Sequence, residues 1–275
     1  MKRIVVPIDF SAYSENAFLT ALRLAERTKS HITCVNVVST LLDWKFLSKE
    51  NRSQHQELLD QEAEAKEKLR LFIASHRLHN VPVNGQVEIG VPRQMILEVA
   101  EQQNASLIVI GAYGTDRQEG KVLGSNLQHV LRNADCPVLA VKKEMSGNDL
   151  RKMAFASLFN NDSKAAFSKI RTVLKDFKTS VHFLFVNTPS NFVDSLAAEA
   201  KMDAYAKGFE DLVIHKHVFN FAESENGIVE FAKSRKMGFI GIASGNRKGS
   251  AYYQVGVTDT ILYKTDLAVL SVKIE

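Results

Sequence analysis

Cysteine is nearly absent from this chain of 275 residues, which has only Cys34 and Cys136. Both lie in apolar runs, a position typical of buried free thiols rather than of a disulfide or a metal site. Long apolar stretches are missing too, since no run approaches the roughly 18 residues that a membrane-spanning helix requires. The first apolar stretch ends at Asp9, too early for the core of a signal peptide. We therefore expect a soluble, cytoplasmic protein that does not enter a membrane.

An excess of one charge is also missing. Lysine and arginine number 35 against 31 aspartates and glutamates, and the net charge of +4 is spread without a long basic block. Proteins that bind nucleic acid concentrate positive charge on one face, so we expect no nucleic-acid partner. The composition, 45% hydrophobic and 24% charged, is that of an ordinary globular protein, and the length suits one large or two small domains.

Several catalytic and cofactor motifs are absent from the sequence. No glycine-rich segment ends in Gly-Lys-Ser or Gly-Lys-Thr, and none reads Gly-x-Gly-x-x-Gly, so neither a P-loop motor nor a classical dinucleotide enzyme is indicated. No Ser/His/Asp or Cys/His arrangement follows from the spacing. His215 and His217 would place two rings on one face of a strand, but no third ligand is evident nearby, so the histidines predict no metal site.

The sequence does contain an internal repeat, in which the same order of predicted strands and helices occurs twice. Residues 3–7 form an apolar run that is followed by a turn and then by apolar residues at helical spacing, and the same order restarts at residues 152–156. The two halves also end alike, at residues 135–141 and 266–272. An internal repeat of this length indicates two copies of one domain.

The order of the predicted elements defines the fold class. Strands that alternate with helices imply βαβ units and a parallel sheet, and right-handed crossovers place helices on both faces. We predict an α/β protein with two tandem, doubly wound, parallel five-stranded sheets, in domains 1–145 and 149–275. Residues 50–79, rich in Glu, Gln, Lys and Leu, predict one long exposed helix in the first domain.

The most informative segment is a glycine loop between a strand and a helix. Gly111 and Gly114 follow an apolar run. After nine intervening residues, Gly124 and Ser125 precede a helix-like run that begins at Asn126. Glycine lets the backbone approach a ligand closely, and the start of a helix offers free N–H groups and the positive end of the helix dipole. The loop therefore predicts an anion site suited to phosphate. Each part alone is equally typical of an ordinary glycine turn or helix start.

These residues resemble the ATP-binding signature of the universal stress protein family. The opening segment 4–11, the turn 90–92 and the final strand 135–141 resemble that family as well, so the likeness spans residues 1 to about 143. The resemblance implies ATP as the ligand, alone or with Mg²⁺, and strand order 3-2-1-4-5 in each half. Strands 1 and 4 are then neighbours, and ligands of doubly wound sheets bind beyond the carboxyl ends where the order reverses. The turn at Asp9 and the loop at Gly111 are thus expected to form one crevice.

Candidate contacts to the nucleoside come from the first two strands. The resemblance implies that Asp9 contacts the nucleoside, and its carboxylate can accept hydrogen bonds from a ribose hydroxyl or an adenine amino group. The alternative is a turn or cap residue, although Ser11 is already available as a cap. Pro7 and Ile8 could form an apolar wall for the base or simply pack in the strand. The main chain near Val37 is implied to contact the adenine edge, and its side chain could equally be core.

Candidate contacts to the phosphates come from the loop. Gly111, Gly114, Gly124, Ser125 and the helix start at Asn126 would supply backbone N–H groups and a hydroxyl. Arg117 lies within the loop and could neutralise phosphate charge, or remain an ordinary solvated side chain. Tyr113 occupies a position where the family often has a small side chain or an imidazole, so it could cover the ligand or alter the shape of the loop.

The second half lacks most of these residues. Leu158 takes the place of Asp9, Ala243 that of Gly111 and Asn246 that of Gly114, and Val257 follows Gly256 where the first half has Ser125. We expect this half to keep the fold without binding ATP. It would replace the partner subunit of single-domain relatives, giving a pseudo-dimer within one chain in which the last strands of the two halves meet. A homodimer of the whole chain stays open.

Three functions remain open at this stage. The first is a stress-response protein in which ATP, bound in the N-terminal domain, controls conformation or the choice of an unidentified protein partner. The second is an interaction protein of the same fold that binds no nucleotide. The third is an enzyme, such as a slow ATPase or an adenylyl-transfer relative. We favour the first and expect no catalytic residue, without excluding slow hydrolysis of ATP.

Overall fold

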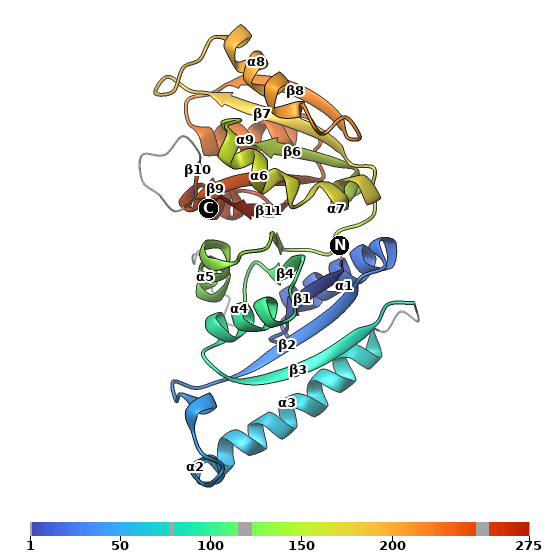
Figure 1. Ribbon diagram of the computed structural model, residues 1–275, viewed down its shortest axis with the longest axis vertical. Helices are drawn as coiled ribbons and strands as arrows, with labels where there is room; N and C mark the ends of the chain where they lie inside the picture. The colour runs from blue at the N-terminus through green and yellow to red at the C-terminus, as the bar shows by residue number, and fades with distance from the viewer. Residues whose placement is uncertain (1, 77–79, 115–122, 246–252, 275) are drawn as a thin grey trace.

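The computed structural model describes residues 2–76, 80–114, 123–245 and 253–274. The molecule is elongated, and its two halves lie one beyond the other with their last strands in the middle (Figure 1). Strands and helices alternate in both halves. The first half contains, in chain order, β1 (Arg3–Pro7), α1 (Ala12–Thr28), β2 (His31–Ser39), the short 3-10 helix η1 (Trp44–Phe46), α2 (Lys49–Ser53), α3 (Gln56–Ser75), β3 (Val83–Gly90), α4 (Pro92–Gln102), β4 (Leu107–Gly111), α5 (Ser125–Asn133) and β5 (Val138–Val141).

The second half repeats this order with small changes. It begins with the 3-10 helix η2 (Asp149–Arg151) and replaces the single helix α1 by two shorter helices, α6 and α7. Its remaining elements are β6 (Lys152–Ala156), α6 (Asn161–Ser168), α7 (Arg171–Asp176), β7 (Ser180–Asn187), α8 (Ser195–Ala206), β8 (Val213–Asn220), α9 (Ser224–Ser234), β9 (Phe239–Gly245), β10 (Tyr253–Gln254), α10 (Val255–Lys264) and β11 (Ala268–Lys273).

Ten strands lie side by side in the order β3-β2-β1-β4-β5-β11-β9-β6-β7-β8, and β10 pairs with β9 outside this row. Within each half the neighbouring strands are parallel, which confirms the predicted doubly wound α/β fold. The two expected sheets form one continuous sheet, because β5 pairs with β11 in antiparallel orientation, with Leu139 opposite Leu270. This pairing hides two strand edges whose N–H and C=O groups would otherwise lack partners.

The antiparallel pairing of β5 with β11 also determines at which edge of the sheet each half could bind a ligand. Ligands of doubly wound sheets bind at the carboxyl ends of the strands. Since β5 and β11 run in opposite directions, the carboxyl ends of the first half and those of the second half face opposite edges of the continuous sheet. The two crevices are therefore separate, and neither half contributes strand ends to the crevice of the other.

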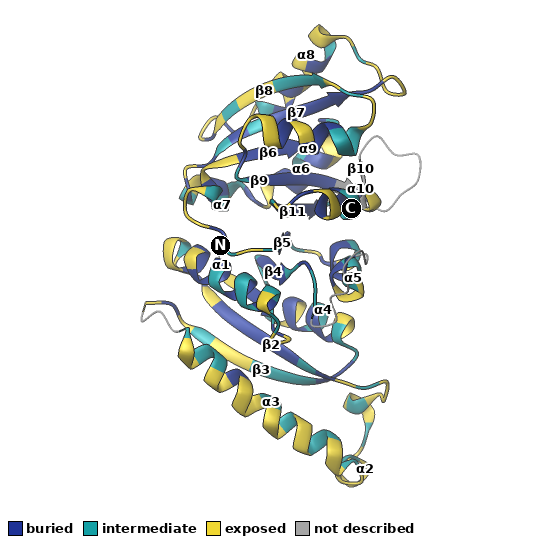
Figure 2. Ribbon diagram, turned by 180° about the vertical axis from the view of Figure 1, so that it is seen from behind, coloured by how far each residue is buried: buried dark blue, intermediate teal, exposed yellow. Residues whose placement is uncertain are grey.

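Helices cover both faces of the sheet. One buried cluster lies under α1, α3, α6, α7 and α8, and a second lies under α4, α5, α9 and α10. The long helix α3 is largely exposed and buries Leu69 alone among its residues (Figure 2). The single helix expected over residues 50–79 is wrong in one respect, because the chain turns at Gln54 and His55 and divides it into α2 and α3. Residues 77–79 lie outside the described part.

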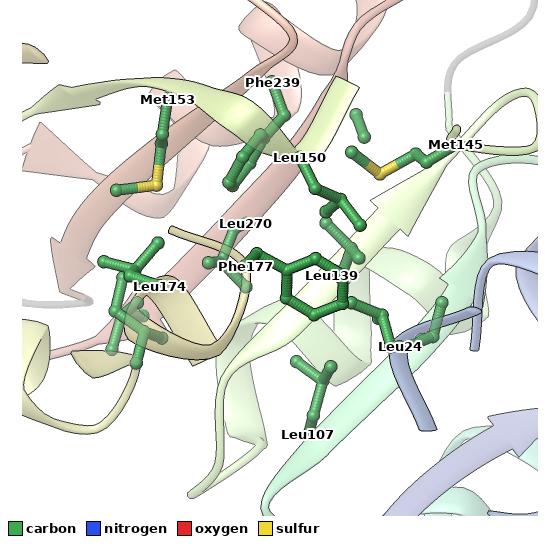
Figure 3. Packing of buried hydrophobic residues seen from close by; sticks show 14 of the residues in the cluster. Leu24, Leu107, Leu139, Met145, Leu150, Met153, Leu174, Phe177, Phe239 and Leu270 are labelled. Atoms are coloured by element: carbon green, nitrogen blue, oxygen red, sulfur yellow. The ribbon is translucent and has the colours of Figure 1, made fainter. Parts of the chain in front are cut away.

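An apolar core joins the two halves. Leu24, Leu107 and Leu139 of the first half pack with Leu174 and Phe177 of the second, as Figure 3 shows. All five side chains are buried, and burial of each large aliphatic or aromatic side chain contributes roughly 1.5–3 kcal/mol. The halves therefore share one core across the junction rather than touching through surface contacts.

Polar contacts reinforce this junction on both faces. Arg132 of α5 donates to Asp259 of α10 at 2.6 Å, and Lys142 Nζ donates to the Thr265 carbonyl at 2.7 Å. Burial raises the pKa of Asp259 despite the facing Arg132, and Asp259 Oδ1 is buried without a hydrogen-bond partner among the described residues. On the other face, Arg27 Nε donates to the Asp176 carbonyl at 3.0 Å. The helix α5, which starts at the glycine loop, is thus bonded directly to the second half.

The internal repeat is visible in the backbone. Phe10 after β1 and Phe159 after β6 both adopt a left-handed conformation, with φ of 63° and 54°, which non-glycine residues seldom do. The next residues, Ser11 and Asn160, both cap the following helix by accepting from a backbone N–H. This correspondence places Leu158 at the position of Asp9, as the sequence alignment predicts.

Candidate functional site

Asp9 lies at the carboxyl end of β1, in the turn that leads into α1. Its Oδ1 accepts hydrogen bonds from the backbone N–H of Ser11 at 3.0 Å and from the Ser11 hydroxyl at 2.6 Å. Ser11 in turn caps α1 by accepting from Ser14 N at 3.2 Å. Ser11 is therefore the cap and Asp9 holds the cap in place. The side chain of Asp9 is exposed, and no described residue donates to its second oxygen, Oδ2.

The glycine loop lies beside Asp9 Oδ2. A Cβ built on Gly114 would lie 3.1 Å from Asp9 Oδ2, and the nearest described atom to a Cβ built on Gly124 would be Gly114 N, at 4.0 Å. The glycine loop and the end of β1 thus converge, although about a hundred residues separate them. No described residue fills the space over the backbone of Gly124, which a side chain there would occupy. These glycines leave room for a ligand next to an exposed carboxylate.

The start of α5 completes this edge. Gly124 is its N-cap and offers no capping side chain, and the first backbone bond of the helix runs from Gln128 N to the Gly124 carbonyl at 3.1 Å. The N–H groups of Ser125, Asn126 and Leu127 precede that bond and have no acceptor within the helix. Both Ser125 and Asn126 are exposed. Such a helix start attracts anions through its free N–H groups and its dipole. Arg117 lies outside the described residues.

Gly111 has a different surrounding from the other glycines of the loop. A Cβ at this position would lie 2.7 Å from the carbonyl carbon of Tyr13 and 2.8 Å from its oxygen. The contact is with the backbone of α1, which cannot move aside like the end of a flexible side chain. Gly111 is therefore required for packing β4 against α1, because a side chain at this position would point into the helix.

The other candidate residues of the first two strands divide between core and edge. The side chain of Ile8 is buried in the core, whereas Pro7 and Val37 are half-buried. The Ile8 carbonyl accepts a hydrogen bond from Asn36 Nδ2 at 2.7 Å. Asn36 was not among the residues expected at the site, although a single amide within the apolar run of β2 is a signal. It fixes the main chain at the carboxyl end of β1, directly before Asp9.

Tyr113 lies between the loop and the junction of the two halves. Its ring packs edge-on against Tyr13 with 5.2 Å between the centroids, and Lys142 Nζ lies 5.5 Å from its centre. Lys142 also bonds the second half through Thr265. Tyr113 therefore links the glycine loop to residues that hold the two halves together, a contact that sequence spacing could not reveal.

The corresponding edge of the second half has no comparable constellation in its described residues. Leu158 is half-buried and cannot accept a hydrogen bond through its side chain, and Ala243 is fully buried. A Cβ built on Gly256 would have no described atom within 4 Å, and Val257 follows without a hydroxyl. Asn246 lies outside the described part. The carboxylate that meets the glycine loop in the first half is replaced by an apolar side chain here.

The described residues show no metal site, no membrane-spanning helix and no reactive thiol. They contain no group of three or more His, Cys, Asp or Glu placed to hold a metal ion, and none of their helices is long and apolar enough to cross a membrane. Both cysteines are free. Burial raises the pKa of the Cys34 thiol far above its usual range and that of Cys136 to about 11, so neither is a reactive thiolate near neutral pH.

The fold and this edge define a class: a tandem, doubly wound α/β protein in which a carboxylate and a glycine loop converge at the carboxyl edge of one half. The profile of the universal stress protein family matches residues 1–142. Over 150 residues the chain is 31% identical to "Universal stress protein MJ0531" of Methanocaldococcus jannaschii, covering 52% of this chain and 82% of that relative. The chain belongs to the universal stress protein family, as its resemblance predicts.

Solved structures extend the likeness to the second half. A universal stress protein from Archaeoglobus fulgidus superposes with a TM-score of 0.74 over 99% of this chain and 98% of its own, at 16% identity. A protein described as a putative universal stress protein from Pseudomonas aeruginosa has a TM-score of 0.62, covers 99% and 93%, and is 17% identical. At such identities the likeness concerns the fold alone, and it shows that the whole two-half arrangement occurs in other proteins.

Proposed function

We propose that this universal stress protein binds one ATP, alone or with Mg²⁺, in its N-terminal half, and that the bound nucleotide acts as a regulatory signal in the stress response. The observation that carries the proposal is the meeting of Asp9, Gly114 and Gly124 at one edge of the sheet. The fit rests on two features, the room that the glycines leave and the carboxylate oxygen that no described residue occupies. Both are what a ligand with hydroxyl and phosphate groups needs.

Each residue has a distinct part in the proposed binding. The free N–H groups at the start of α5, with the hydroxyl of Ser125, would donate to phosphate oxygens. Gly114 keeps the backbone of the loop accessible to them. Asp9 Oδ2 would accept from a hydroxyl or amino group of the nucleoside, while Oδ1 stays bonded to Ser11. Pro7 and the main chain at Val37 would line the side of the base.

The second half supports binding without repeating it. It bonds α5 through Arg132 and Asp259, and it bonds the segment next to Tyr113 through Lys142. A ligand that favours one arrangement of the loop would shift the protein toward that arrangement by its differential affinity. A change at the loop then reaches the junction through α5. The alternative is an interaction protein of the same fold that binds no nucleotide, in which Asp9 serves only to hold the Ser11 cap.

Two substitutions of Asp9 separate these functions. Asp9→Ala is expected to weaken ATP binding by about 1–3 kcal/mol, the range for a hydrogen bond to a charged group. Asp9→Asn keeps an oxygen that can accept from Ser11, so it should preserve the cap and lose affinity through Oδ2 alone. The measurement is the shift in melting temperature that saturating ATP produces in each protein, with the melting temperature without ATP as the measure of the cap. An ATP-dependent shift of equal size in wild type and both variants, or no shift in wild type, would overturn the proposal.

Catalysis is not part of the proposed function. ATP cleavage requires a positioned water, a base and commonly a metal clamp. Oδ1 of Asp9, the carboxylate that the described residues place at this edge, is already engaged with Ser11. We expect hydrolysis far below the ~1–100 s⁻¹ of kinases. A steady-state assay with and without Mg²⁺ measures it, with Ser125→Ala as the comparison. Turnover above about 1 s⁻¹ that disappears in Ser125→Ala would instead establish an enzyme.

A further inference from the structure

Three histidines gather on one face of the second half, away from the glycine loop. His215 and His217 alternate along β8, and His182 on the adjacent strand β7 lies directly opposite His215 in the parallel register. The third imidazole that the sequence did not reveal is therefore supplied by the neighbouring strand. The ring of His217 also packs against Phe231 of α9, with 4.9 Å between centroids, which places this imidazole cluster on the α9 face of the sheet.

The rings of the imidazole cluster are stacked and share a hydrogen bond. The His182 centroid lies 4.7 Å from that of His215 and 5.1 Å from that of His217, with interplanar angles of 26° and 14°. His182 Nδ1 and His217 Nε2 are 2.9 Å apart. One of these nitrogens must donate and the other accept, so at least one ring is neutral while the bond exists. Nearly parallel rings do not direct their lone pairs to one point, in keeping with the lack of a metal-holding group among the described residues.

The charged groups that face the imidazole cluster are positive. Lys152 at the start of β6 and Arg235 at the end of α9 both disfavour a proton on His182, and Arg235 does the same for His217. No described carboxylate forms an ion pair with any of the three imidazoles. Burial, followed by the neighbouring imidazoles and these cations, lowers the pKa of His182 to about 4, and burial with Arg235 lowers that of His217.

The strand that carries two of these rings is the outermost strand of the second half. Among the described strands, β7 alone pairs with β8, and the residues of β8 are exposed or half-buried (Figure 2). Edge strands open more readily than central ones because fewer contacts hold them. Repulsion between charged rings on β7 and β8 would act directly across the ladder that attaches β8.

We propose that the cluster of His182, His215 and His217 is a proton-sensitive switch that holds β8 against β7 at neutral pH and loosens it on acidification. In the neutral cluster, two rings share one hydrogen bond and all three stack. A second proton converts both bonded nitrogens into donors, breaks that bond and leaves two cations in contact beside Lys152 and Arg235. The opened strand edge and the α9 face behind it then become accessible. This inference is independent of nucleotide binding in the first half.

The direction of the pH dependence follows from the pKa shifts. The folded protein holds His182 and His217 at lower pKa values than the roughly 6.5 of an unfolded chain. Unfolding or local opening therefore takes up protons. The stability that the neutral cluster contributes is fully present above about pH 6.5 and is lost as the pH falls toward the pKa of His182, about 4.

Amide exchange, expressed as protection factors that correct for the intrinsic effect of pH, tests this on the full chain. The strand β3 is an internal control, because it occupies the same outer position in the first half and contains no histidine. Between pH 7.0 and pH 5.0 we expect protection of β8 to fall at least tenfold relative to β3. His182→Gln removes the central proton acceptor and should abolish most of that difference. His31→Gln, an exposed histidine on β2, should leave it unchanged.

The other outcomes are equally decisive. Equal changes of protection in β3 and β8 would refute the switch. A loss of protection in β8 that is as large in His182→Gln as in the wild type would refute it as well. Should His182→Gln fail to fold, the exposed neighbour provides a second variant, His215→Gln, which is expected to reduce the acid-induced loss of protection without disturbing the two half-buried rings. An acid-induced loss of β8 protection that is unchanged in His215→Gln would contradict the assignment of the switch to the imidazole cluster.

Discussion

Gly114→Val is expected to lower the affinity for ATP by at least about 100-fold, equivalent to about 2.8 kcal/mol, while the protein remains folded. A Cβ at this position lies 3.1 Å from Asp9 Oδ2, so the valine side chain presses on the carboxylate and fills the space beside Gly124. The backbone of the loop can then no longer be approached by a phosphate. Isothermal titration calorimetry measures the affinity, and circular dichroism with thermal melting measures the fold.

A matched control comes from a glycine with free space. Gly147 lies between the two halves, and a Cβ there has no described atom within 4 Å. Gly147→Val should therefore bind ATP as the wild type does. If Gly114→Val retains the wild-type affinity for ATP, the edge between Asp9 and Gly124 is not the binding site, however tightly the wild-type protein binds ATP.

Gly111→Ala is expected to lower the free energy of unfolding by about 1–3 kcal/mol, the usual cost of overpacking, or more. The added Cβ would lie 2.7 Å from the backbone carbonyl of Tyr13, and neither β4 nor α1 can yield without disturbing the sheet. This glycine and Gly114 are three residues apart in one motif, yet the structure predicts opposite consequences. Loss of Gly111 affects folding first, and loss of Gly114 affects binding first. Urea denaturation followed by circular dichroism measures the effect.

The equivalent position in the second half provides the comparison. Ala243 occupies the place of Gly111 and is fully buried, so that half accommodates a Cβ. Ala243→Gly should cost no more than about 1 kcal/mol, the penalty for a glycine within a strand. Unchanged stability in Gly111→Ala would show that α1 can move away from β4, and the packing role assigned to this glycine would be lost.

Much of the fold could be predicted from the sequence because its signals are local. Apolar runs, helical spacing and the restart near residue 152 indicate two doubly wound halves. The meeting of the last strands of the two halves was expected, and β5 pairs with β11. That this pairing joins the two sheets into one was not foreseen, since it depends on hydrogen bonds between two strands more than a hundred residues apart. The division of the expected long helix at Gln54 and His55 was missed because a charged, exposed segment has no apolar stripe to mark where a helix ends.

The candidate site was predictable in its outline and less so in its roles. Asp9, Gly114 and Gly124 converge because the strand order places their loops at one edge. The sequence could not distinguish Gly111, which packs against α1, from Gly114, which faces Asp9, since both are glycines of one loop. Asn36 was overlooked because a strand pattern does not show which carbonyl an amide will reach. His182 was overlooked for a similar reason, because the register between strands β7 and β8 brings it to His215.

Under the proposed function, one half of this chain binds ATP and the other does not. Calorimetric titration of the intact protein with ATP tests it most directly, since the stoichiometry counts the sites without any mutation. We predict one ATP per chain, bound in the half that contains Asp9, Gly114 and Gly124, and loss of that single site in Gly114→Val. Two equivalent sites would contradict the loss of binding in the second half, and no binding at all would contradict the nucleotide function itself.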